Sequence, residues 1–383
     1  MQVSLGNGEN TLTVGSSSQY VTVKDASFDV GLLANNNGLV ANSIDMYLGK
    51  YAANEDGSIA ALQLTGNLGD ANIAMQQGGS ADENMMSMLI GAGSKTDTLL
   101  GNSTIDFGNG NNTLTVSNGV ETATELAGAE FVFGSEGKHL VQVGSGLSVY
   151  EPQNTVLIEK ATFDMGGSHD ATLSIHAHGK MVRDQDSGTF VEQGSDVTLK
   201  NTGTDVSSGD MTSNSTSKFV VTLGSGNDTF TLDNSTESLG TLPENTRKTL
   251  VDVNLGEGVN TVLIKGNAEQ GENIRVGGVI SGDSVIELGD GNDSLQFRTD
   301  TGNGNYMRIE SGATIHLGGG NDTLDVAPGH LENVTFNLGT GQDNFRFFRA
   351  AANAEGDSTT VGGNNLTVIA EEGGSFAEIG MDW

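Results

Sequence analysis

The chain has 383 residues, of which 56 are Gly and only 3 are Pro, and this composition indicates a repetitive all-β architecture rather than compact globular domains. Acidic residues outnumber basic ones 49 to 17, and the resulting net charge of -32 makes nucleic acid and anionic membranes poor partners. The complete lack of Cys excludes disulfides, thiolate metal sites and cysteine nucleophiles. The acidic surplus favours a hard divalent cation bound through oxygen, with calcium as the first candidate.

The N-terminus at Met1 carries neither a basic nor an apolar leader segment. No run of about 18 apolar residues occurs in the sequence, so we expect no membrane insertion. If the protein is exported, its signal lies outside these residues or is not an N-terminal leader. The chain also starts and stops in mid-pattern, which predicts either a segment of a longer repetitive protein or a subunit that stacks end to end.

One ten-residue phrase returns seven times along the chain with small changes. Each copy contains a Gly-Asx turn followed by a short alternating strand, and a similar strand precedes it. The copies are Leu5–Val14, Phe107–Val116, Leu223–Leu232, Leu255–Ile264, Leu288–Phe297, Leu317–Val326 and Leu338–Phe347. From Phe107 to Leu317, and with degenerate copies included, the phrases start about 30 residues apart.

A unit of this kind cannot bury its apolar side alone, so successive units are expected to stack. The sequence therefore predicts an all-β fold, a parallel β-solenoid of the β-helix or β-roll kind, with coils of about 30 residues and Gly-Asn-Asp turns. The usual crossover preference favours a right-handed coil. Residues 1–106 are expected to form an irregular N-terminal part of the solenoid, and residues 107–383 the regular part.

Two less regular segments interrupt the pattern. A Met-rich stretch, Glu83–Ile90, reads as a short helix or an inward strand, and Glu121–Ala129 reads as one or two helical turns. The simplest interpretation of both is a loop packed on the solenoid flank, because Met commonly fills irregular gaps.

The turn phrase resembles the nonapeptide GGxGxDxUx of the RTX, or hemolysin-type calcium-binding, family. LGGGNDTLD from Leu317 matches that nonapeptide at all but its first position. The resemblance implies a segment of a large secreted bacterial repeat protein, with calcium held between stacked turns by Asp side chains and turn carbonyls. It implies calcium-ligand roles for Asp228, Asp293, Asp322 and Asp343. It also implies that the turn is shaped by Gly224, Gly226, Gly289, Gly291, Gly318, Gly320, Gly339 and Gly341, and that Leu295 and Leu324 plug the core.

Physical reasoning is compatible with calcium in these turns. Two ligands on opposite sides of a calcium ion lie roughly 4.8 Å apart, which is also the spacing of stacked coils. Asp293, Asp322 and Asp343 are the best candidates because their turns are consecutive, whereas the Asn260 coil separates Asp228 from them.

The phrase also departs from the family pattern. Each phrase is isolated in a long coil, Leu or Phe replaces the first Gly, and the Asp position is Asn at Asn10, Asn112 and Asn260. The alternative to a metal site is a ladder in which Asn and Asp side chains hydrogen-bond the turn backbone of the next coil.

The distribution of identical turns along the chain favours a scaffold over an enzyme. The leading hypothesis is a non-enzymatic, calcium-binding, extracellular structural or adhesive module on a bacterial cell surface, as in an adhesin, an S-layer or a biofilm matrix. End-to-end or lateral self-association and a surface glycan are the expected partners besides calcium. We expect folding in millimolar calcium outside the cell to accompany secretion.

The alternative hypothesis is a polysaccharide-acting parallel β-helix enzyme, a lyase, epimerase or hydrolase. Its best locus is the segment Ser174–Asp186, where His176 and His178 share one strand face. Charge stabilisation and proton transfer would come from Lys180, Arg183 and Asp186. A zinc ion at the two His residues is weakly supported, because no third ligand lies nearby in the sequence.

Glycan binding through aromatic stacking has few candidate residues, since the chain has 1 Trp and 5 Tyr. The one aromatic and basic patch is Asn344–Arg349. Alternation predicts that Phe345 and Phe347 point into the core, which leaves Phe348 and Arg349 for a lateral contact.

Overall fold

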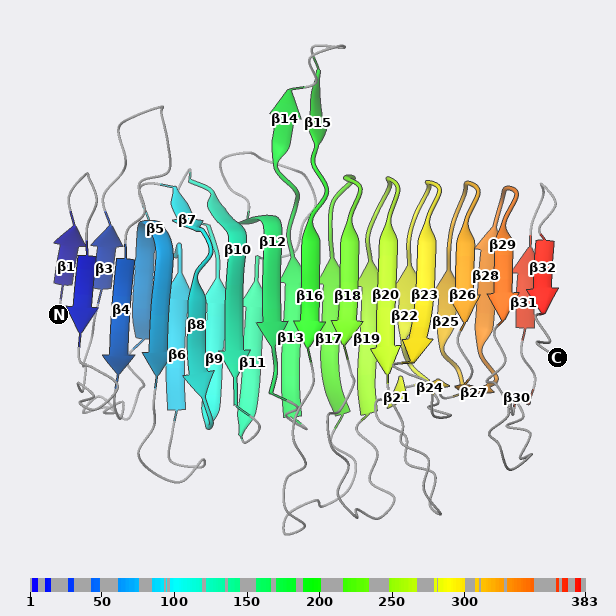
Figure 1. Cartoon of the computed structure of the whole chain (residues 1–383), viewed down its shortest axis with the longest axis horizontal. Coiled ribbons are helices and arrows are strands. Elements are labelled where there is room, and N and C mark those ends of the chain that lie inside the picture. Colours follow the sequence, from blue (N-terminus) through cyan, green and yellow to red (C-terminus); the bar gives the residue numbers. More distant parts are fainter. Residues whose placement is uncertain are drawn as a thin grey trace, which may run out of the picture. The chain divides into compact units, whose positions relative to one another are not determined.

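The structure is a computed structural model of the whole chain (Figure 1). It describes residues 2–5, 11–14, 27–30, 43–48, 61–75, 85–92, 94, 97–118, 122–134, 137–144, 156–166, 170–183, 189–200, 216–233, 248–266, 279–280, 282–299, 307–309, 311–326, 329–347, 363–364, 367–370 and 376–379.

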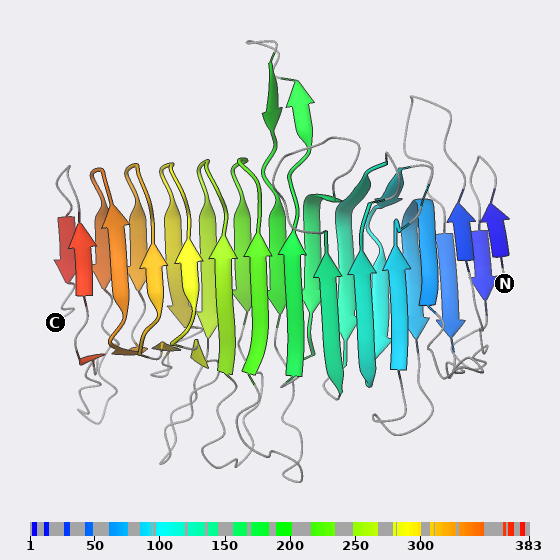
Figure 2. The ribbon, with the colours of Figure 1, turned by 180° about the vertical axis from the view of Figure 1, so that it is seen from behind.

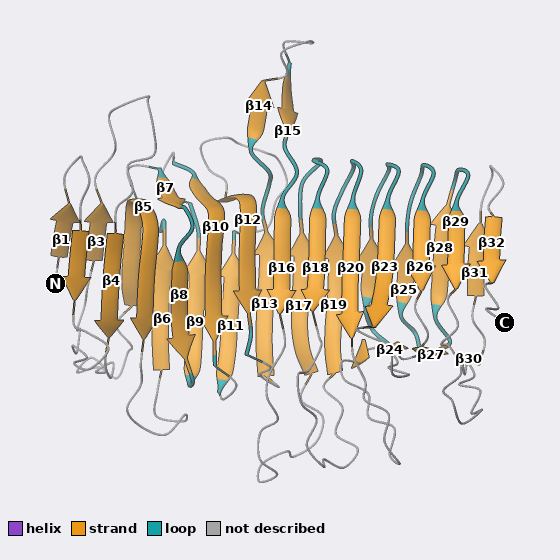
Figure 3. Ribbon diagram, in the orientation of Figure 1, coloured by secondary structure: helices purple, strands orange, loops and turns teal. Residues whose placement is uncertain are grey.

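The chain divides into two compact units, Met1–Val197 and Thr198–Trp383. The described residues of both units form β-strands and contain no helix (Figure 3), and therefore no helix that is long and apolar enough to cross a membrane. Parallel pairing of strands from successive coils confirms the predicted solenoid architecture within each unit. The division at residue 106 that the sequence predicts is based on the regularity of the repeat, whereas the division into these two units is based on compactness.

The first unit contains strands β1 to β15. They are β1 (Gln2–Leu5), β2 (Thr11–Val14), β3 (Ser27–Val30), β4 (Ser43–Leu48), β5 (Ala61–Met75), β6 (Met85–Ile90), β7 (Thr98–Leu100), β8 (Thr104–Gly108), β9 (Asn111–Val116), β10 (Thr124–Phe133), β11 (Lys138–Val143), β12 (Val156–Asp164), β13 (Asp170–His176), β14 (Met181–Arg183) and β15 (Phe190–Glu192). Strand β16 (Asp196–Lys200) contains the boundary between the units.

Two parallel sheets make up most of the first unit and appear as two layers (Figures 1 and 2). One runs through β1, β3, β5, β6, β9, β11 and β13, and the other through β2, β4, β5, β7, β8, β10 and β12. Inward side chains of successive coils stack on one another: the rings of Phe107 and Phe133 are 4.5 Å apart, and those of Phe131 and Phe163 are 5.0 Å apart. Such stacks bury large apolar areas along the unit.

The second unit contains the remaining strands. They are β17 (Thr216–Thr222), β18 (Thr229–Asp233), β19 (Lys248–Asn254), β20 (Thr261–Gly266), β21 (Val279–Ile280), β22 (Val285–Glu287), β23 (Ser294–Thr299), β24 (Met307–Ile309), β25 (Thr314–His316), β26 (Thr323–Val326), β27 (Gly329–Glu332), β28 (Thr335–Gly339), β29 (Asn344–Phe347), β30 (Gly363–Asn364), β31 (Thr367–Ala370) and β32 (Phe376–Ile379).

The second unit has the same plan with greater regularity. One sheet runs through β17, β19, β22, β25, β28 and β31, and the other through β18, β20, β23, β26, β29 and β32. The short strands β21, β24, β27 and β30 pair in a third column. A turn joins each of β17, β19, β22, β25 and β28 to the next strand of the second sheet, and the Gly-Asx phrase is that turn.

Alternation along each strand places apolar side chains between the sheets. In β18, Phe230 and Leu232 are fully buried while their neighbours are partly exposed. Leu295 and Leu324 are likewise fully buried, which confirms their predicted core positions. Phe345 is 4% exposed, so the inward orientation predicted for it is also correct.

Two sequence expectations are wrong. Residues Met85–Ile90 form strand β6, with Met88 and Ile90 fully buried, so the inward-strand alternative holds and the flanking loop does not. Of Glu121–Ala129, residues 124–129 belong to strand β10 rather than to a helical turn or a flanking loop, and Glu121 lies outside the described residues. In both segments, parallel pairing with neighbouring coils outweighs the weak local preference of the sequence.

The first unit also carries an antiparallel hairpin that the repeat does not predict. Strand β14 pairs with β15 through Met181 and Glu192, Val182 and Val191, and Arg183 and Phe190. Figure 1 shows the hairpin extending beyond the ends of the neighbouring strands.

Candidate functional site: the stacked turns of the second unit

The Asx residues of five successive turns form one column, which we call the Asx column. Its members are Asp228, Asn260, Asp293, Asp322 and Asp343, and each is at most 2% exposed. The turns that contain them follow β17, β19, β22, β25 and β28 at one end of the sheets (Figure 3). Parallel stacking therefore brings predicted site residues that are far apart in the sequence into one line.

The four column side chains after Asp228 each accept a hydrogen bond from the backbone of the coil before them. The donors and Oδ1 acceptors are Asp228 N to Asn260 at 3.0 Å, Asn260 N to Asp293 at 2.7 Å, Asp293 N to Asp322 at 2.9 Å, and Asp322 N to Asp343 at 3.1 Å. This is the ladder that the sequence offered as the alternative to a metal site. The bonding supports the turns in the described geometry without an ion.

An exposed column beside it bonds in the opposite direction. Here the side-chain Oδ1 accepts from the backbone of the following coil: Asn227 from Val259 at 2.8 Å, Asn292 from Asn321 at 2.8 Å, and Asn321 from Gln342 at 2.9 Å. The two columns together tie neighbouring turns from both sides, which explains why the phrase carries two consecutive Asx residues in most copies.

The second side-chain atom distinguishes Asn from Asp in the column. Asn260 uses its Nδ2 to donate to the carbonyl oxygens of Leu288 at 2.8 Å and Gly256 at 3.3 Å. Asp293 and Asp322 hold Oδ1 in the same ladder, so Oδ2 takes the place of that donor. Both Oδ2 atoms are buried and have no hydrogen-bond partner. A buried carboxylate oxygen without a donor is costly, so the Asp turns favour a proton or a cation at this point.

The pKa values of Asp293 and Asp322 are raised, which agrees with the lack of a hydrogen-bond donor at Oδ2. Burial, together with the carboxylates of Asp322 and Asp290, raises the pKa of Asp293 to about 7, against the lowering effect of its hydrogen bond from Asn260. Burial, with Asp343 and Asp290 nearby, raises the pKa of Asp322 to about 6. The column therefore carries less negative charge at mildly acidic pH than its composition implies.

The turn glycines allow the coils to approach each other. At Gly318 the backbone φ is +99°, and a Cβ would lie 1.7 Å from the carbonyl oxygen of Gly289. At Gly320 the φ is +139°, and a Cβ would lie 1.5 Å from the oxygen of Gly291. Both positions therefore exclude any side chain, and the turn-shaping role predicted for these glycines has a steric basis.

The first unit contains a shorter version of the same column. Asn112 is 1% exposed, and its Nδ2 lies 3.1 Å from the Gly108 oxygen and 3.2 Å from the Gly110 oxygen. Its partner in the next coil is His139, also 1% exposed. Asn112, His139 and Asn260 thus all present an N–H group to turn carbonyls, which the Asp turns cannot do when ionised.

The donor set at the Asp turns consists of oxygen alone, which suits a hard cation such as calcium. Each turn would supply one carboxylate and its carbonyl oxygens. In the part of the chain that the structure describes, no three His, Asp or Glu side chains gather into a metal-binding group. The calcium-ligand roles of Asp228, Asp293, Asp322 and Asp343 stay a prediction.

The segment proposed for catalysis is dispersed in the structure. His176 and His178 are both partly buried and take different partners: Ser174 Oγ lies 3.1 Å from His176 Nε2, and Glu192 Oε1 lies 3.1 Å from His178 Nδ1. Glu192 was missed from the sequence because it arrives on the hairpin, and it also accepts from Gly179 N at 2.8 Å.

The basic residues of that segment do not contact its two histidines in any hydrogen bond or ion pair described for them. Lys180 Nζ lies 2.9 Å from Glu125 Oε1, and this hydrogen bond raises the pKa of Lys180. Arg183 is exposed on β14, and Asp186 lies outside the described residues. Among the described residues of the segment, the contacts do not assemble one set of acid, base and charge-stabilising groups.

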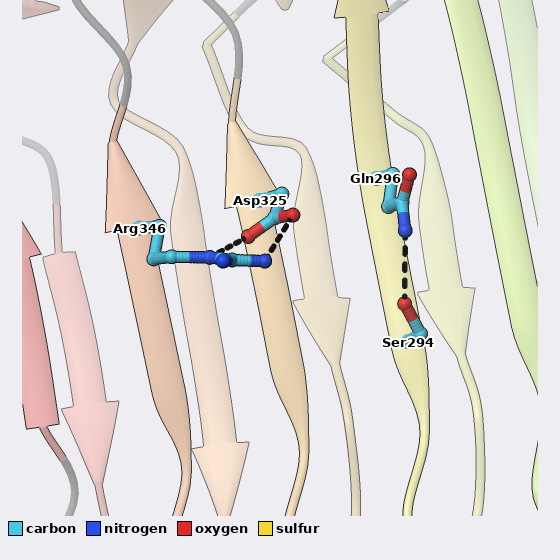
Figure 4. A network of polar contacts seen from close by, with 4 residues as sticks. All are labelled: Ser294, Gln296, Asp325 and Arg346. Carbon is cyan, nitrogen blue, oxygen red and sulfur yellow. Dashed lines mark hydrogen bonds and ion pairs between the residues drawn. The ribbon is translucent and has the colours of Figure 1, made fainter.

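The aromatic and basic patch contains an ion pair between the partly exposed Arg346 and the buried Asp325. Arg346 Nε and Nη2 lie 2.5 Å and 2.6 Å from the two carboxylate oxygens of Asp325, which is 1% exposed (Figure 4). Gln296, in the same row of the sheet, donates instead to Ser294 Oγ on its own strand at 3.3 Å. Phe348 and Arg349 lie outside the described residues, as does the side chain of Phe347.

Comparison with protein-family models, with curated proteins and with solved structures finds no match to this chain.

Proposed function

We propose that the chain is a non-enzymatic, extracellular structural or adhesive module of a bacterial cell surface, and that the Asp turns of its second unit bind calcium. One observation carries the proposal: the same backbone-to-side-chain hydrogen bond occurs four times and links the turns of five successive coils. A scaffold needs such uniformity along its length, whereas catalysis needs different groups gathered at one place.

Support for calcium comes from Asp293 and Asp322. Each has a buried Oδ2 without a hydrogen-bond donor, at a position where Asn260 presents an amide to turn carbonyls. A divalent cation would satisfy this oxygen and offset the repulsion between neighbouring carboxylates. The similarity of the phrase to the RTX nonapeptide supports calcium and secretion in the same way.

The test is a calcium titration of the chelator-stripped chain by isothermal calorimetry, with thermal melts in chelator and in calcium. We expect binding and a raised Tm, since each ion adds about 1.4 kcal/mol at tenfold excess over its Kd. The D293N/D322N variant is expected to lose most of both effects. The D252N/D283N variant removes two exposed carboxylates and should behave as the original chain. Equal calcium responses in all three chains, or no binding at all, contradict the calcium assignment.

Light scattering on the same samples tests self-association. Growth in particle size on adding calcium supports a surface layer or filament. A constant monomer mass in both conditions contradicts assembly while leaving the calcium-binding scaffold in place.

A further inference from the structure

His139 in β11 occupies the Asx position of its coil, in a column that is separate from the Asp turns. It pairs in register with Asn112 of β9 on one side and with Ala171 of β13 on the other. The imidazole ring lies 5.1 Å from the ring of Phe133, and the residue is 1% exposed. The histidine is therefore packed into the turn rather than displayed on the surface.

Both ring nitrogens of His139 are engaged. Its Nε2 lies 2.8 Å from the carbonyl oxygen of Gly134, which can only accept, so Nε2 carries the hydrogen. Its Nδ1 lies 3.3 Å from Nδ2 of Asn112 and is therefore the unprotonated, accepting nitrogen. This arrangement fits the neutral imidazole and fixes its tautomer.

A second proton on His139 has no place in this arrangement. An Nδ1–H group would face the amide donor of Asn112 at 3.3 Å. Turning the Asn112 amide over would bring its oxygen against the carbonyl oxygens of Gly108 and Gly110, which now lie 3.1 and 3.2 Å from its nitrogen. Either choice loses hydrogen bonds in a buried turn.

The surroundings do little to favour the charged form. The titratable residues on the strands packed around it are Asp106 on β8, Glu125 and Glu130 on β10, Lys138 on β11, and Asp170 and His176 on β13. Asp106 and Lys138 are exposed, and the position opposite His139 on β13 is the uncharged Ala171. Burial lowers the pKa of His139, and its hydrogen bond to Gly134 only partly opposes this effect.

We propose that His139 and Asn112 form an acid-sensitive latch, in which protonation of the imidazole opens the contact of residues 108–112 with Gly134 and residues 137–139 of the next coil and loosens that part of the first unit. At neutral pH the latch is closed. The inference concerns the first unit and does not depend on calcium binding in the second, so either proposal can fail without the other.

Hydrogen exchange of the full chain in chelator, read by mass spectrometry at pH 7.5 and pH 5 and corrected for intrinsic rates, tests the latch. We expect segments 107–116 and 133–143 to lose about tenfold or more protection at pH 5, equivalent to about one pKa unit of proton binding. H139N, which places in this coil the residue type found at Asn112 and Asn260, should keep its protection. H316N, which alters a partly exposed histidine of the second unit, should lose protection as the original chain does.

Equal protection at both pH values in the original chain, or an equal loss in H139N, overturns the proposal. If H139N does not fold, H139Q supplies an amide that reaches towards Gly134 in its place. NMR titration of His139 in the unaltered chain gives an independent answer: a pKa below 6.5 is expected, and a value at or above 6.5 overturns the latch.

Discussion

The Oδ1 of Asp322 accepts a hydrogen bond from the backbone N–H of Asp293 at 2.9 Å, across 29 residues of sequence. Each of these carboxylates is therefore half satisfied: one oxygen completes the turn of the preceding coil, and Oδ2 is buried without a partner. The stability of the Asp turns must then depend on what neutralises Oδ2, because the rest of the turn is already bonded.

The first prediction concerns the D293N/D322N variant in chelator at pH 8. Each new amide keeps Oδ1 in the ladder and adds a donor to turn carbonyls, as Asn260 does. We expect the free energy of unfolding in urea to rise by about 1 to 3 kcal/mol per site.

The matched control for that variant is D252N/D283N, which removes two exposed carboxylates away from the column. Its free energy of unfolding should change by no more than about 0.5 kcal/mol per site. A D293N/D322N chain less stable than the original in chelator would show that the Oδ2 atoms are not a liability.

The second prediction is the pH dependence of the same chains in chelator. The pKa values of Asp293 and Asp322 are raised from 3.8 to about 7 and about 6, so the folded chain binds more protons than the unfolded chain in this interval. Their contribution to the free energy of unfolding is therefore greatest below pH 3.8 and falls as pH rises, by at most about 4 kcal/mol for Asp293.

Urea titrations at intervals from pH 4 to pH 8 measure this slope. Subtracting the D293N/D322N curve from that of the original chain isolates the two carboxyls. His139 works in the opposite sense, because its lowered pKa makes the first unit less stable as pH falls below 6.5. A difference curve that rises with pH would contradict the burial argument.

The strand–turn–strand arrangement of each coil could be predicted from the sequence, because the same turn-forming and core residues recur in every copy of the phrase. Gly318 and Gly320 sit where the backbone requires them, and Leu324 follows the turn as a core residue. The secondary structure of residues Met85–Ile90 was harder to predict, because a short apolar run is compatible with a strand, a helix or a loop. Its strand is determined by pairing with the neighbouring coils, in β5 and β9.

Side-chain partners between coils could not be read in the same way. Predicting the ladder between Asx residues requires the register of the sheets, which the sequence does not give. The Asp turns also differ from the Asn260 turn by only one atom of the Asx side chain. His139 was not identified as a column member because its phrase, FGSEGKHL, has one residue more than the phrase from Phe107 before the position equivalent to Asn112. Glu192 meets His178 only through the hairpin, which has no signal in the repeat.

The third prediction compares two glycines of one turn. Gly318→Ala places a Cβ 1.7 Å from a backbone oxygen at a positive φ, and neither can move without separating the coils. Gly319→Ala meets only side-chain ends, Asp290 Oδ1 at 2.9 Å and Thr340 Oγ1 at 3.2 Å. We expect the first change to cost about 2 to 4 kcal/mol in urea denaturation and the second less than about 1 kcal/mol. Equal costs would show that the coils do not pack as closely as described.

The last prediction concerns the pair of Arg346 and Asp325. Arg346→Met leaves the carboxylate of Asp325 buried and unbalanced at 1% exposure, and we expect a loss of about 3 to 5 kcal/mol in the free energy of unfolding. Asp325→Asn combined with Arg346→Met removes the uncompensated charge and should recover most of that loss.

Lys265→Met is the control for this cycle, because Lys265 lies 3.9 Å from Asp233 in a partly exposed pair and should cost less than about 1 kcal/mol. If Arg346→Met costs no more than Lys265→Met, the carboxylate of Asp325 reaches solvent in the folded chain. A double variant as unstable as the single one would instead assign the loss to the packing of the arginine stem over the sheet, not to its charge.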